Sequence, residues 1–359
     1  MKIGLLIYGS LDTLSGGYLY DRKLVNYLRN QGDLVQVISL PWRNYFRHLA
    51  DNFSPRLYHS LAGLDVDVLL QDELNHPSLF LLNRRLAQKK GYPVISIVHH
   101  LRCREARPGW QNRLYAWVER RYLASLDGFV FNSQATQQEV EGLLGEGLQL
   151  PGVVAYPAGD RFHAEITPEE IARRAGLPGP LQLIFVGNVI PRKGLHTLIA
   201  ALAQAASQAG LFLTVVGDLQ ADKAYAARLR RQVARAGLEA QVRFTGRLTD
   251  EQLAKALRES QVLVAPSSYE GFGIVYLEAM GFGLPAIGAK AGGAGEIITP
   301  GKDGYLIGPG DAQALSARLA ELAHDRQRLL SLSLAARQRF EQHPSWQESM
   351  QRIRTFLLE

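Results

Sequence analysis

Short apolar runs separated by longer stretches with helical spacing recur along the first half of the chain. The first run, IGLLIY at 3–8, precedes a glycine-bearing loop and a segment with helical periodicity from Tyr18 to Asn30. Further runs of the same type lie at 34–40, 67–71, 94–98 and 128–133. Such runs, bounded by turn residues, are typical of buried strands. Their alternation with helices predicts a parallel sheet covered on both faces.

The same alternation starts again after the proline- and glycine-rich segment GLPGPLQ at 176–182. Apolar runs of strand length follow at 183–187, 212–217, 242–246, 262–267 and 285–289. The pattern therefore predicts an α/β protein with two doubly wound, Rossmann-like domains, at 1–178 and 179–344. The last segment, 345–359, has apolar residues at helical spacing, so we expect an amphipathic helix that packs on one of them.

Length and composition agree with a two-domain globular protein. A chain of 359 residues with 47% hydrophobic and 21% charged residues can bury two cores. Its apolar runs are shorter than the roughly 20 residues of a membrane-spanning helix. The first run resembles a strand rather than a signal peptide, and the single cysteine, Cys103, cannot form an internal disulfide. We therefore expect a cytoplasmic protein.

The positive charge is concentrated in one segment. Residues 43–121 contain 13 Lys and Arg against 7 Asp and Glu, which accounts for the whole net charge of +6. Within it, PWRNYFRHLADNFSPRLYHSLA at 41–62 places aromatic residues on one helical face with arginines beside them. Helical spacing argues against a nucleic-acid platform. Two interpretations remain: the face is buried in its own domain, or it contacts an anionic membrane or a phosphate-bearing acceptor.

Two loops have the form of a phosphate site at the end of a strand. In the first half, SGG at 15–17 lies between a strand and a helix, where glycines let backbone N–H groups approach a ligand. In the second half, VGNVIPRKG at 186–194 places Arg192 and Lys193 just before a helix. This pair is either a solvated basic turn or a diphosphate site. We favour the diphosphate site because Pro191 and Gly194 fix the turn.

The segment SSYEGFGIVYLEAMGFGLP at 267–285 carries two carboxylates, Glu270 and Glu278. In one continuous helix they would lie about 12 Å apart along the axis. The glycines instead predict a loop up to Gly273 and a helix from about Ile274 to Met280. Backbone N–H groups at 272–275 would then face a ligand, and the two carboxylates would reach different parts of it.

Other chemistry for these carboxylates is less well supported. A hydrolase uses paired carboxylates, but it has no need of a diphosphate site. The DVD sequence at 65–67 begins a strand, so we expect no metal there. An anion site beside two polyol-binding carboxylates is the arrangement expected for a nucleotide sugar.

At this point a family resemblance becomes visible. The run SSYEGFGIVYLEAMGFGLPAIGAKAGGAGEII resembles the E-x7-E signature of the family-4 retaining glycosyltransferases of the GT-B fold, and FVGNVIPRKGLHTLIAAL is similar to their phosphate-binding segment. Segments SGGYLYDRKLVNYLRNQGDLVQVISL and YPAGDRF and the terminal helix match in the expected order, so the resemblance covers the chain. It implies two facing doubly wound domains with the terminal helix crossing back to the first. It also implies transfer of a hexose from a UDP- or GDP-sugar, with no metal and no cofactor.

The resemblance assigns a role to each candidate residue. Glu278 would hold the ribose hydroxyls and Glu270 the sugar hydroxyls. The remaining donor contacts would come from backbone groups and cations, namely Gly16, Gly17, Asn188, Arg192, Lys193, Phe272, Gly273 and Ile274. His99 matches the histidine near the donor sugar, with His100 as the alternative. The implied catalytic set is His99, Arg192, Lys193 and Glu270, with His100, Arg102 and Arg104 on the acceptor side.

One position departs from the family pattern. The family usually has an arginine directly after the glycine of the phosphate strand, where this chain has Asn188. Asparagine can donate a hydrogen bond but carries no charge. We expect Arg192 to compensate. The alternatives are a nucleotide-sugar epimerase or phosphorylase of the same fold, or a nucleotide-sugar-binding protein with weakened catalysis. The basic segment further suggests a position at the inner face of the cell membrane.

Overall fold

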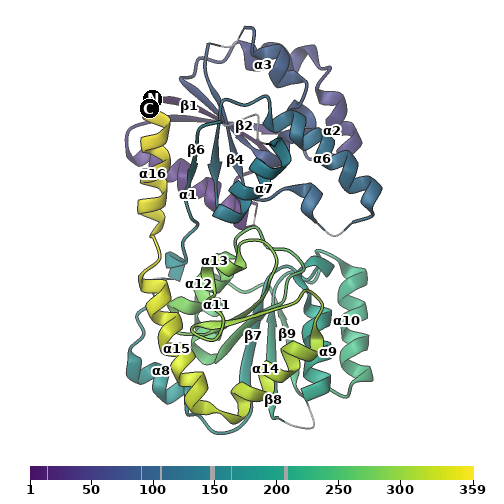
Figure 1. The fold of residues 1–359 in the computed structure, drawn as a ribbon, viewed down its shortest axis with the longest axis vertical. Coiled ribbons are helices and arrows are strands. Elements are labelled where there is room, and N and C mark those ends of the chain that lie inside the picture. Colours follow the sequence, from purple (N-terminus) through teal and green to yellow (C-terminus); the bar gives the residue numbers. More distant parts are fainter. Residues whose placement is uncertain (14, 90, 106, 146–149, 163, 206–208) are drawn as a thin grey trace. The chain divides into compact units, whose positions relative to one another are not determined.

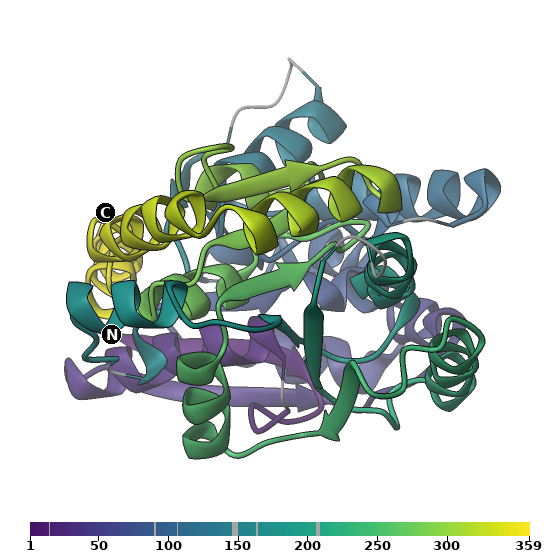
Figure 2. The same cartoon turned by 90° about the horizontal axis from the view of Figure 1, so that it is seen from below.

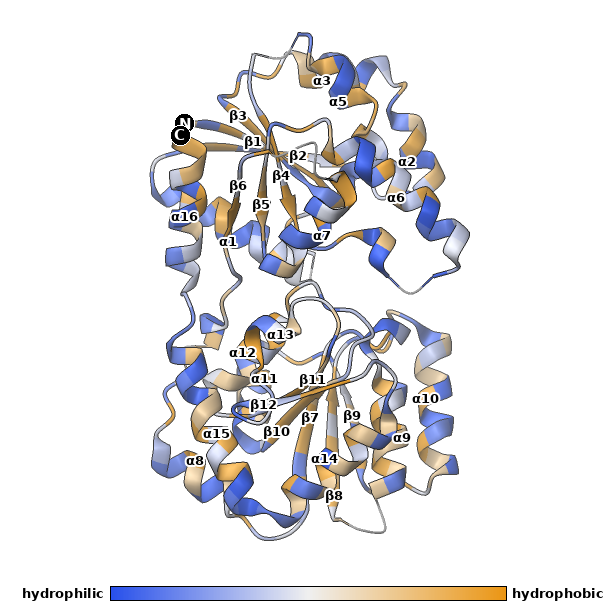
Figure 3. Ribbon diagram, viewed as in Figure 1, coloured by the Kyte–Doolittle hydropathy of each residue, from blue (hydrophilic) through white to orange (hydrophobic). Residues whose placement is uncertain are grey.

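The apolar runs form the strands of two six-stranded parallel sheets in the computed structural model (Figure 1). The structure describes residues 1–13, 15–89, 91–105, 107–145, 150–162, 164–205 and 209–359. The chain divides into a first unit, Met1–Pro157 with Trp346–Glu359, and a second unit, Ala158–Ser345. Apolar residues occupy the strands of both sheets (Figure 3). The predicted α/β class with two parallel sheets is confirmed.

The sheet of the first unit has the order β2-β1-β3-β4-β5-β6. Its strands are β1 Lys2–Tyr8, β2 Leu34–Leu40, β3 Val68–Asp72, β4 Val94–Val98, β5 Gly128–Phe131 and β6 Gly152–Val154. Because β2 and β3 flank β1 on opposite sides, the direction in which successive strands are added to the sheet reverses there. In open parallel sheets, ligands bind at such a switch point, beyond the carboxyl ends of the strands. A ligand-binding site in the first unit is therefore expected at the loops after β1, β3 and β4.

Helices connect these strands and cover the sheet. They are α1 Gly16–Asn30, α2 Tyr45–Asp51, α3 Pro55–Ala62, η1 Glu73–Asn75, α4 His76–Leu79, α5 Leu82–Leu86, η2 Arg102–Arg104, α6 Gly109–Leu123, α7 Gln134–Leu144 and α16 Trp346–Leu358. The last of these, α16, packs on α1 and β6. Its buried side chains include Trp346, Met350 and Ile353. Arg354 Nε also donates to Asp33 Oδ2 at 2.7 Å. The terminal helix thus belongs to the first unit.

The second sheet has the order β12-β11-β10-β7-β8-β9, which places its switch point between β7 and β10. Its strands are β7 Leu181–Val186, β8 Leu211–Val216, β9 Val242–Gly246, β10 Val262–Ala265, β11 Ala286–Ala289 and β12 Gly304–Ile307. The helices are η3 Asp160–Phe162, α8 Pro168–Ala175, η4 Pro191–Lys193, α9 Leu195–Ala205, α10 Lys223–Arg235, α11 Asp250–Glu259, α12 Ile274–Gly281, α13 Ala294–Ile297, α14 Ala312–His324 and α15 Arg326–Glu341. They lie on both faces of the sheet (Figure 2).

The division between the units falls at Pro157 and Ala158, before the proline- and glycine-rich segment that suggested a boundary at 178. The reason is that α8 packs on α15 of the second unit. Arg174, near the end of α8, also donates to the carbonyl oxygens of Phe282 and Gly283 at 2.7 and 2.9 Å. Among the described residues, no helix is long and apolar enough to span a membrane.

Candidate functional site

The predicted basic pair lies at the switch point of the second sheet. After β7 the chain turns through η4, and Gly194 adopts a left-handed conformation with φ +69°. A Cβ at Gly194 would lie 1.9 Å from the carbonyl oxygen of Pro266, just after β10, so only glycine allows this approach. The loop that carries Arg192 and Lys193 is therefore held directly against the segment that carries Glu270.

Glu270 lies between the two cations. Lys193 Nζ is 2.6 Å from Glu270 Oε2, and Arg192 Nη1 is 3.9 Å from the same oxygen. Arg192 Nη1 also donates to the carbonyl oxygen of Tyr269 at 2.8 Å. Burial disfavours the charged carboxylate, but Lys193 and Arg192 outweigh this effect and lower the pKa of Glu270. Glu270 is thus ionised at neutral pH.

The glycines of the signature shape the start of α12. Gly273 has φ +99° and directly precedes Ile274, and among the described residues no side chain caps this helix. The helix bounds, Ile274–Gly281, confirm the predicted loop-to-helix change. Gly292 and Gly293 brace the preceding loop, since Gly293 N donates to the Glu270 carbonyl at 2.9 Å. A Cβ at Gly292 would lie 1.9 Å from that same carbonyl oxygen.

Glu278 lies within α12 with only 6% of its surface exposed. Arg161 Nη1 approaches Glu278 Oε1 at 3.5 Å, while the same guanidinium also pairs with Asp250. Burial raises the pKa of Glu278, and Arg161 offsets this effect only in part. Gly159 lets the segment that carries Arg161 approach α12 closely, because a Cβ at Gly159 would lie 2.6 Å from the backbone of Leu277. Sequence reasoning missed Arg161 as a neighbour of Glu278, although the YPAGDRF segment contains it.

Asn188 lies on the same loop as the basic pair, directly after Gly187. Its side chain is exposed, whereas Arg192 and Lys193 are half-buried. The backbone at this point is closely packed, since a Cβ at Gly217 would lie 1.8 Å from the carbonyl oxygen of Gly187. The positive charge of this loop is therefore supplied by Arg192 and Lys193.

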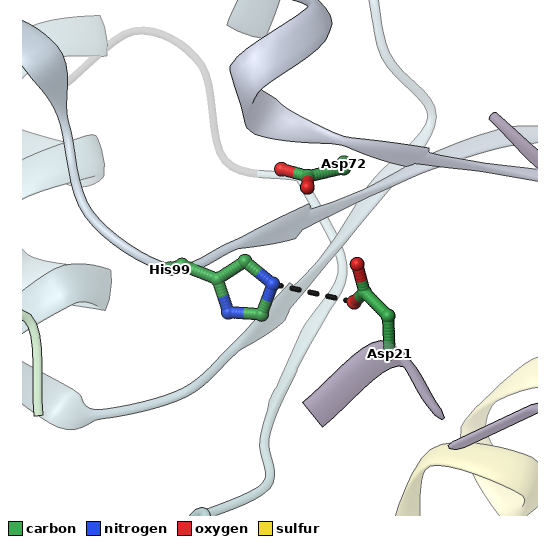
Figure 4. Close-up of side chains that lie close together, drawn as sticks. All are labelled: Asp21, Asp72 and His99. Carbon is green, nitrogen blue, oxygen red and sulfur yellow. Dashed lines mark hydrogen bonds and ion pairs between the residues drawn. The ribbon is translucent and has the colours of Figure 1, made fainter. Parts of the chain in front are cut away.

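In the first unit, His99 follows β4 and lies against two buried carboxylates. His99 Nε2 is 3.3 Å from Asp21 Oδ1 of α1 (Figure 4). Asp72, at the end of β3, completes a group whose polar atoms all lie within 4.8 Å of one another. Among the described residues, Asp21 Oδ2 and Asp72 Oδ2 have no hydrogen-bond partner. This cluster sits at the switch point of the first sheet.

The carboxylates control the charge of the imidazole. Burial alone would lower the pKa of His99, but Asp21 and Asp72 outweigh it and raise that pKa to about 9. Burial and the charge of Asp21 in turn raise the pKa of Asp72 to about 7. His99 is therefore a cation at neutral pH. The predicted loop glycines, Gly16 and Gly17, lie beside this cluster at the start of α1. A Cβ at Gly17 would be 3.1 Å from His99 Cδ2.

The acceptor-side candidates have other surroundings. His100 Nε2 is 3.0 Å from Glu105 Oε1. Arg102 begins η2, its backbone N–H donates to Glu119 Oε1 at 2.6 Å, and Arg104 is exposed. A second group of Glu73, His76 and Glu119 has, like the His99 cluster, a geometry that could hold a metal ion. In this second group the Glu119 carboxylate accepts backbone hydrogen bonds from Arg102 and Cys103, and His76 Nδ1 lies 2.9 Å from Glu73 Oε1.

Two parallel α/β units with charged groups at their switch points define a class of proteins that bind nucleotide-like ligands. A family model described as glycosyl transferases group 1 matches residues 168–339, and one described as glycosyl transferase 4-like domain matches residues 20–150. The chain belongs to this family of glycosyltransferases.

Individual relatives match different lengths of the chain. The glycogen synthase of Mycobacterium tuberculosis is 30% identical over 278 residues, which cover 76% of this chain and 63% of the relative. The sulfoquinovosyl transferase of Arabidopsis thaliana is 40% identical over 114 residues, which cover 31% of this chain and 22% of the relative. The phosphatidyl-myo-inositol mannosyltransferase of Mycobacterium leprae is 25% identical and covers 95% of this chain and 93% of the relative. The chain thus spans less than two thirds of the first two relatives.

Solved structures show the same fold. Sucrose-phosphate synthase from Thermosynechococcus elongatus superposes with a TM-score of 0.82 at 22% identity, covering 99% of this chain and 97% of that chain. Anabaena HepE, solved in complex with UDP-glucose, superposes with a TM-score of 0.78 at 22% identity, covering 100% and 99%. These structures establish the GT-B fold for the chain.

Proposed function

We propose that the chain is a retaining glycosyltransferase that moves a hexose from a nucleoside diphosphate sugar to an acceptor without a metal ion. The observation that carries the proposal is the cluster of Arg192, Lys193 and Glu270 at the switch point of the second sheet, where Lys193 Nζ lies 2.6 Å from Glu270 Oε2. Two cations are suited to a diphosphate, and an ionised carboxylate is suited to sugar hydroxyls. We assign donor binding to the second unit and the acceptor side to the first.

The proposed chemistry follows from these charges. Departure of the nucleoside diphosphate leaves negative charge on its phosphates, and preorganised cations that stabilise this charge lower the barrier. Arg192 and Lys193 have that role, supported by backbone N–H groups of Phe272, Gly273 and Ile274 at the start of α12. Glu278 accepts hydrogen bonds from the ribose. The charge that is missing at Asn188 is supplied by Arg192.

For the first unit we propose His99 rather than His100 as the histidine of the reaction. His99 is buried, lies against Gly17 and is held by Asp21, whereas His100 pairs with Glu105. A buried group fixed by packing and a hydrogen bond is positioned more accurately than one in a half-buried pair. A cationic imidazole at this position would donate a hydrogen bond to a sugar hydroxyl.

We propose a UDP- or GDP-hexose as the donor. The HepE structure with UDP-glucose supports uridine, and a relative from Corynebacterium glutamicum that is named a GDP-mannose-dependent mannosyltransferase supports guanosine. The Mycobacterium leprae relative is named for a phosphatidylinositol acceptor. We propose the broader class of a lipid or an anionic glycan precursor for this chain, and a cytoplasmic location at the inner face of the cell membrane.

A thermal-shift panel of UDP-, GDP- and ADP-sugars tests donor binding, because a ligand that binds the native state raises the melting temperature. We expect one base to raise it strongly, with and without EDTA. The selected donor is then incubated with acceptor mixtures, and the anomeric configuration of the product is determined by NMR. Retention supports the proposal. Isomerisation of the donor without an acceptor would indicate an epimerase, and dependence on free phosphate would indicate a phosphorylase.

The effect of Asn188 is tested separately with Asn188→Arg. If Arg192 and Lys193 suffice, this variant changes kcat by less than about tenfold, which corresponds to 1.4 kcal/mol. A barely active wild type that gains orders of magnitude in Asn188→Arg would instead identify a binding protein with weakened catalysis.

A further inference from the structure

The exposed face of α6 alternates aromatic and arginine side chains. Trp110, Arg113, Trp117 and Arg120 are all exposed, the two tryptophans by 64% and 48%. At 3.6 residues per turn, this spacing places the four side chains on one narrow stripe of the helix. The guanidinium of Arg121 lies 4.0 Å from the centre of the Trp117 ring. Large aromatic side chains are seldom left in water without a reason.

Helix α2 and the residues beside it bury polar side chains and expose several aromatic ones. His48 and Asn52 are buried, and Asn52 Nδ2 donates to the carbonyl of Pro77 at 2.8 Å. Phe46 and Phe53 are 69% and 71% exposed, and Trp42 just before the helix is 53% exposed. Of the two interpretations of residues 41–62, burial of the aromatic face in its own domain holds only in part. Tyr45 and Leu49 are half-buried, and Leu49 packs on the core of the first unit. Trp42, Phe46 and Phe53 remain exposed.

The two helices are neighbours on the first unit (Figure 1). The rings of Tyr45 on α2 and Tyr115 on α6 lie 4.5 Å apart. The guanidinium of Arg102 lies 5.3 and 5.2 Å from these two rings, so it joins the helices. We call the exposed residues of 42–59 and 110–120 the aromatic–basic face.

The charge of this face has one sign. The structure describes every residue of 42–62 and 109–121, and every exposed ionisable side chain there is basic: Arg43, Arg47, Arg56, His59, Arg113 and Arg120. The carboxylates of these segments face inward. Asp51 accepts a hydrogen bond from Ser78, and Glu119 accepts from the backbone of Arg102. Asp51 also pairs with Arg43, whose Nη1 lies 2.9 Å from Asp51 Oδ1. The aromatic–basic face thus combines apolar rings with a net positive charge.

We propose that this face docks on the surface of an anionic lipid bilayer. Tryptophan and phenylalanine insert at the headgroup level, while arginine pairs with lipid phosphate. A second copy of this chain is a poor occupant, because a two-fold contact would place the same arginines against one another. Helix α10 provides a contrast, since it is more basic than α6 but its aromatic residue, Tyr225, is buried. This proposal does not depend on the transfer reaction.

Tryptophan fluorescence reports the contact directly. The chain has four tryptophans, and Trp42, Trp110 and Trp117 lie on the aromatic–basic face, whereas Trp346 is buried at 5% exposure. Vesicles of phosphatidylglycerol are expected to shift the emission to the blue, and lipids brominated near the headgroup should quench it. Vesicles of phosphatidylcholine alone should bind far less, and added salt should weaken binding.

Paired variants separate the contributions of the arginines and of the tryptophans to membrane binding. Arg113→Gln with Arg120→Gln should weaken partitioning about fivefold for each arginine removed, from about 1 kcal/mol per basic residue. Trp110→Ser with Trp117→Ser should remove the blue shift and most of the binding. Arg231→Gln with Arg235→Gln on α10 is the matched control for charge and should bind as the wild type does. Circular dichroism melting of each variant verifies that it is folded.

Co-sedimentation with vesicles measures binding independently of fluorescence. The proposal is overturned if the wild-type protein sediments with neither phosphatidylglycerol nor phosphatidylcholine vesicles. It is also overturned if the α10 control loses as much binding as the α6 variants. A concentration-dependent dimer in light scattering, abolished by Trp110→Ser with Trp117→Ser and unaffected by vesicles, would likewise assign the face to a second copy and overturn the lipid assignment.

Discussion

The imidazole of His99 lies against carboxylates from two other elements, and these carboxylates set its protonation. Asp21 is 78 positions away in the sequence, yet its Oδ1 is 3.3 Å from His99 Nε2. Because the hydrogen bond and charge of Asp21 stabilise the imidazolium, the histidine stays charged where a buried imidazole would ordinarily be neutral. In the reaction proposed above, Asp21 and Asp72 would act through His99, so we propose them as positioning residues.

Asp21→Asn is therefore expected to lower the pKa of His99 from about 9 toward or below its ordinary value. The reason is that burial remains while the largest opposing contribution is lost. Proton NMR titration of the imidazole Cε1–H signal of His99 measures this pKa in both proteins. A His99 pKa that is the same in the wild type and in Asp21→Asn would contradict the assignment.

The interaction of His99 with Asp21 also makes the stability of the fold depend on pH. The folded-state pKa of His99 is raised above the ordinary 6.5, so its contribution is fully present below pH 6.5 and is lost as the pH rises through about 9. Each unit of that shift corresponds to about 1.4 kcal/mol. Urea unfolding should show a falling free energy of unfolding between pH 7 and pH 10. The fall should be smaller in His99→Gln, and an equal fall in both proteins would assign it to other groups.

The sequence predicted the residues that lie close together along the chain and missed those that the fold brings in from a distance. Arg192, Lys193, Glu270 and Glu278 lie in two compact motifs, and the structure brings the first three together. Arg161 reaches Glu278 from 117 positions away. No local spacing encodes such a contact, because it depends on how η3 packs on α12.

At the scale of elements, the glycines that brace the Glu270 loop are the feature most sensitive to change. Gly292 has φ +73°, and a Cβ there would lie 1.9 Å from the Glu270 carbonyl oxygen. The strain of the left-handed conformation costs a side chain about 1–2 kcal/mol, and the collision adds to it. The two effects can be separated because other glycines have the conformation without the collision.

Gly292→Ala should therefore lower the melting temperature and reduce donor turnover, since the loop that carries Glu270 must move. Gly237→Ala is the matched control, because Gly237 has φ +65° with no atom within 4 Å of its added Cβ among the described residues. We expect the control to lose about 1 kcal/mol and to keep its turnover. Equal losses of turnover in both variants would show that the brace has no role in the site.

Most strands could be predicted from hydrophobic runs, including the edge strands β2 and β9, but the other two edge strands could not. β6 and β12 span only Gly152–Val154 and Gly304–Ile307 at the ends of their sheets. With three residues, β6 is too short to show a periodicity. For α2 the amphipathic pattern was visible in the sequence, but the face that points inward could not be, because the buried network around His48 and Asn52 involves residues beyond that segment.

At the scale of the molecule, the chain crosses back so that its last helix completes the first unit. Ile353 is fully buried on α16, and Arg354 joins the helix to Asp33, which also binds the N-terminal amine at 2.8 Å. The joint at 176–182 looked like a domain boundary because proline and glycine are frequent in linkers. Packing of α8 on α15 places that segment inside the second unit.

Ile353→Ala should destabilise the first unit by about 2–5 kcal/mol, the usual cost of such a truncation in a core. Thr355→Ala, at an exposed position on the same helix, is the control and should change stability by less than about 0.5 kcal/mol. Urea unfolding followed by circular dichroism measures both. Equal stabilities of the Ile353→Ala variant and the wild type would contradict the packing of α16 on α1 and β6.

The central claim is that Glu270 and Glu278 hold opposite ends of one nucleotide sugar. Calorimetric titration of the wild type, Glu270→Ala and Glu278→Ala with the selected nucleoside diphosphate, and then with its sugar, tests this claim most directly. We predict that Glu278→Ala weakens both ligands by about 1.5–3 kcal/mol, the range for a hydrogen bond to a charged group. We predict that Glu270→Ala binds the nucleoside diphosphate as the wild type does, and loses affinity and turnover only with the sugar attached. Equal losses of nucleoside diphosphate affinity in both variants would contradict the account.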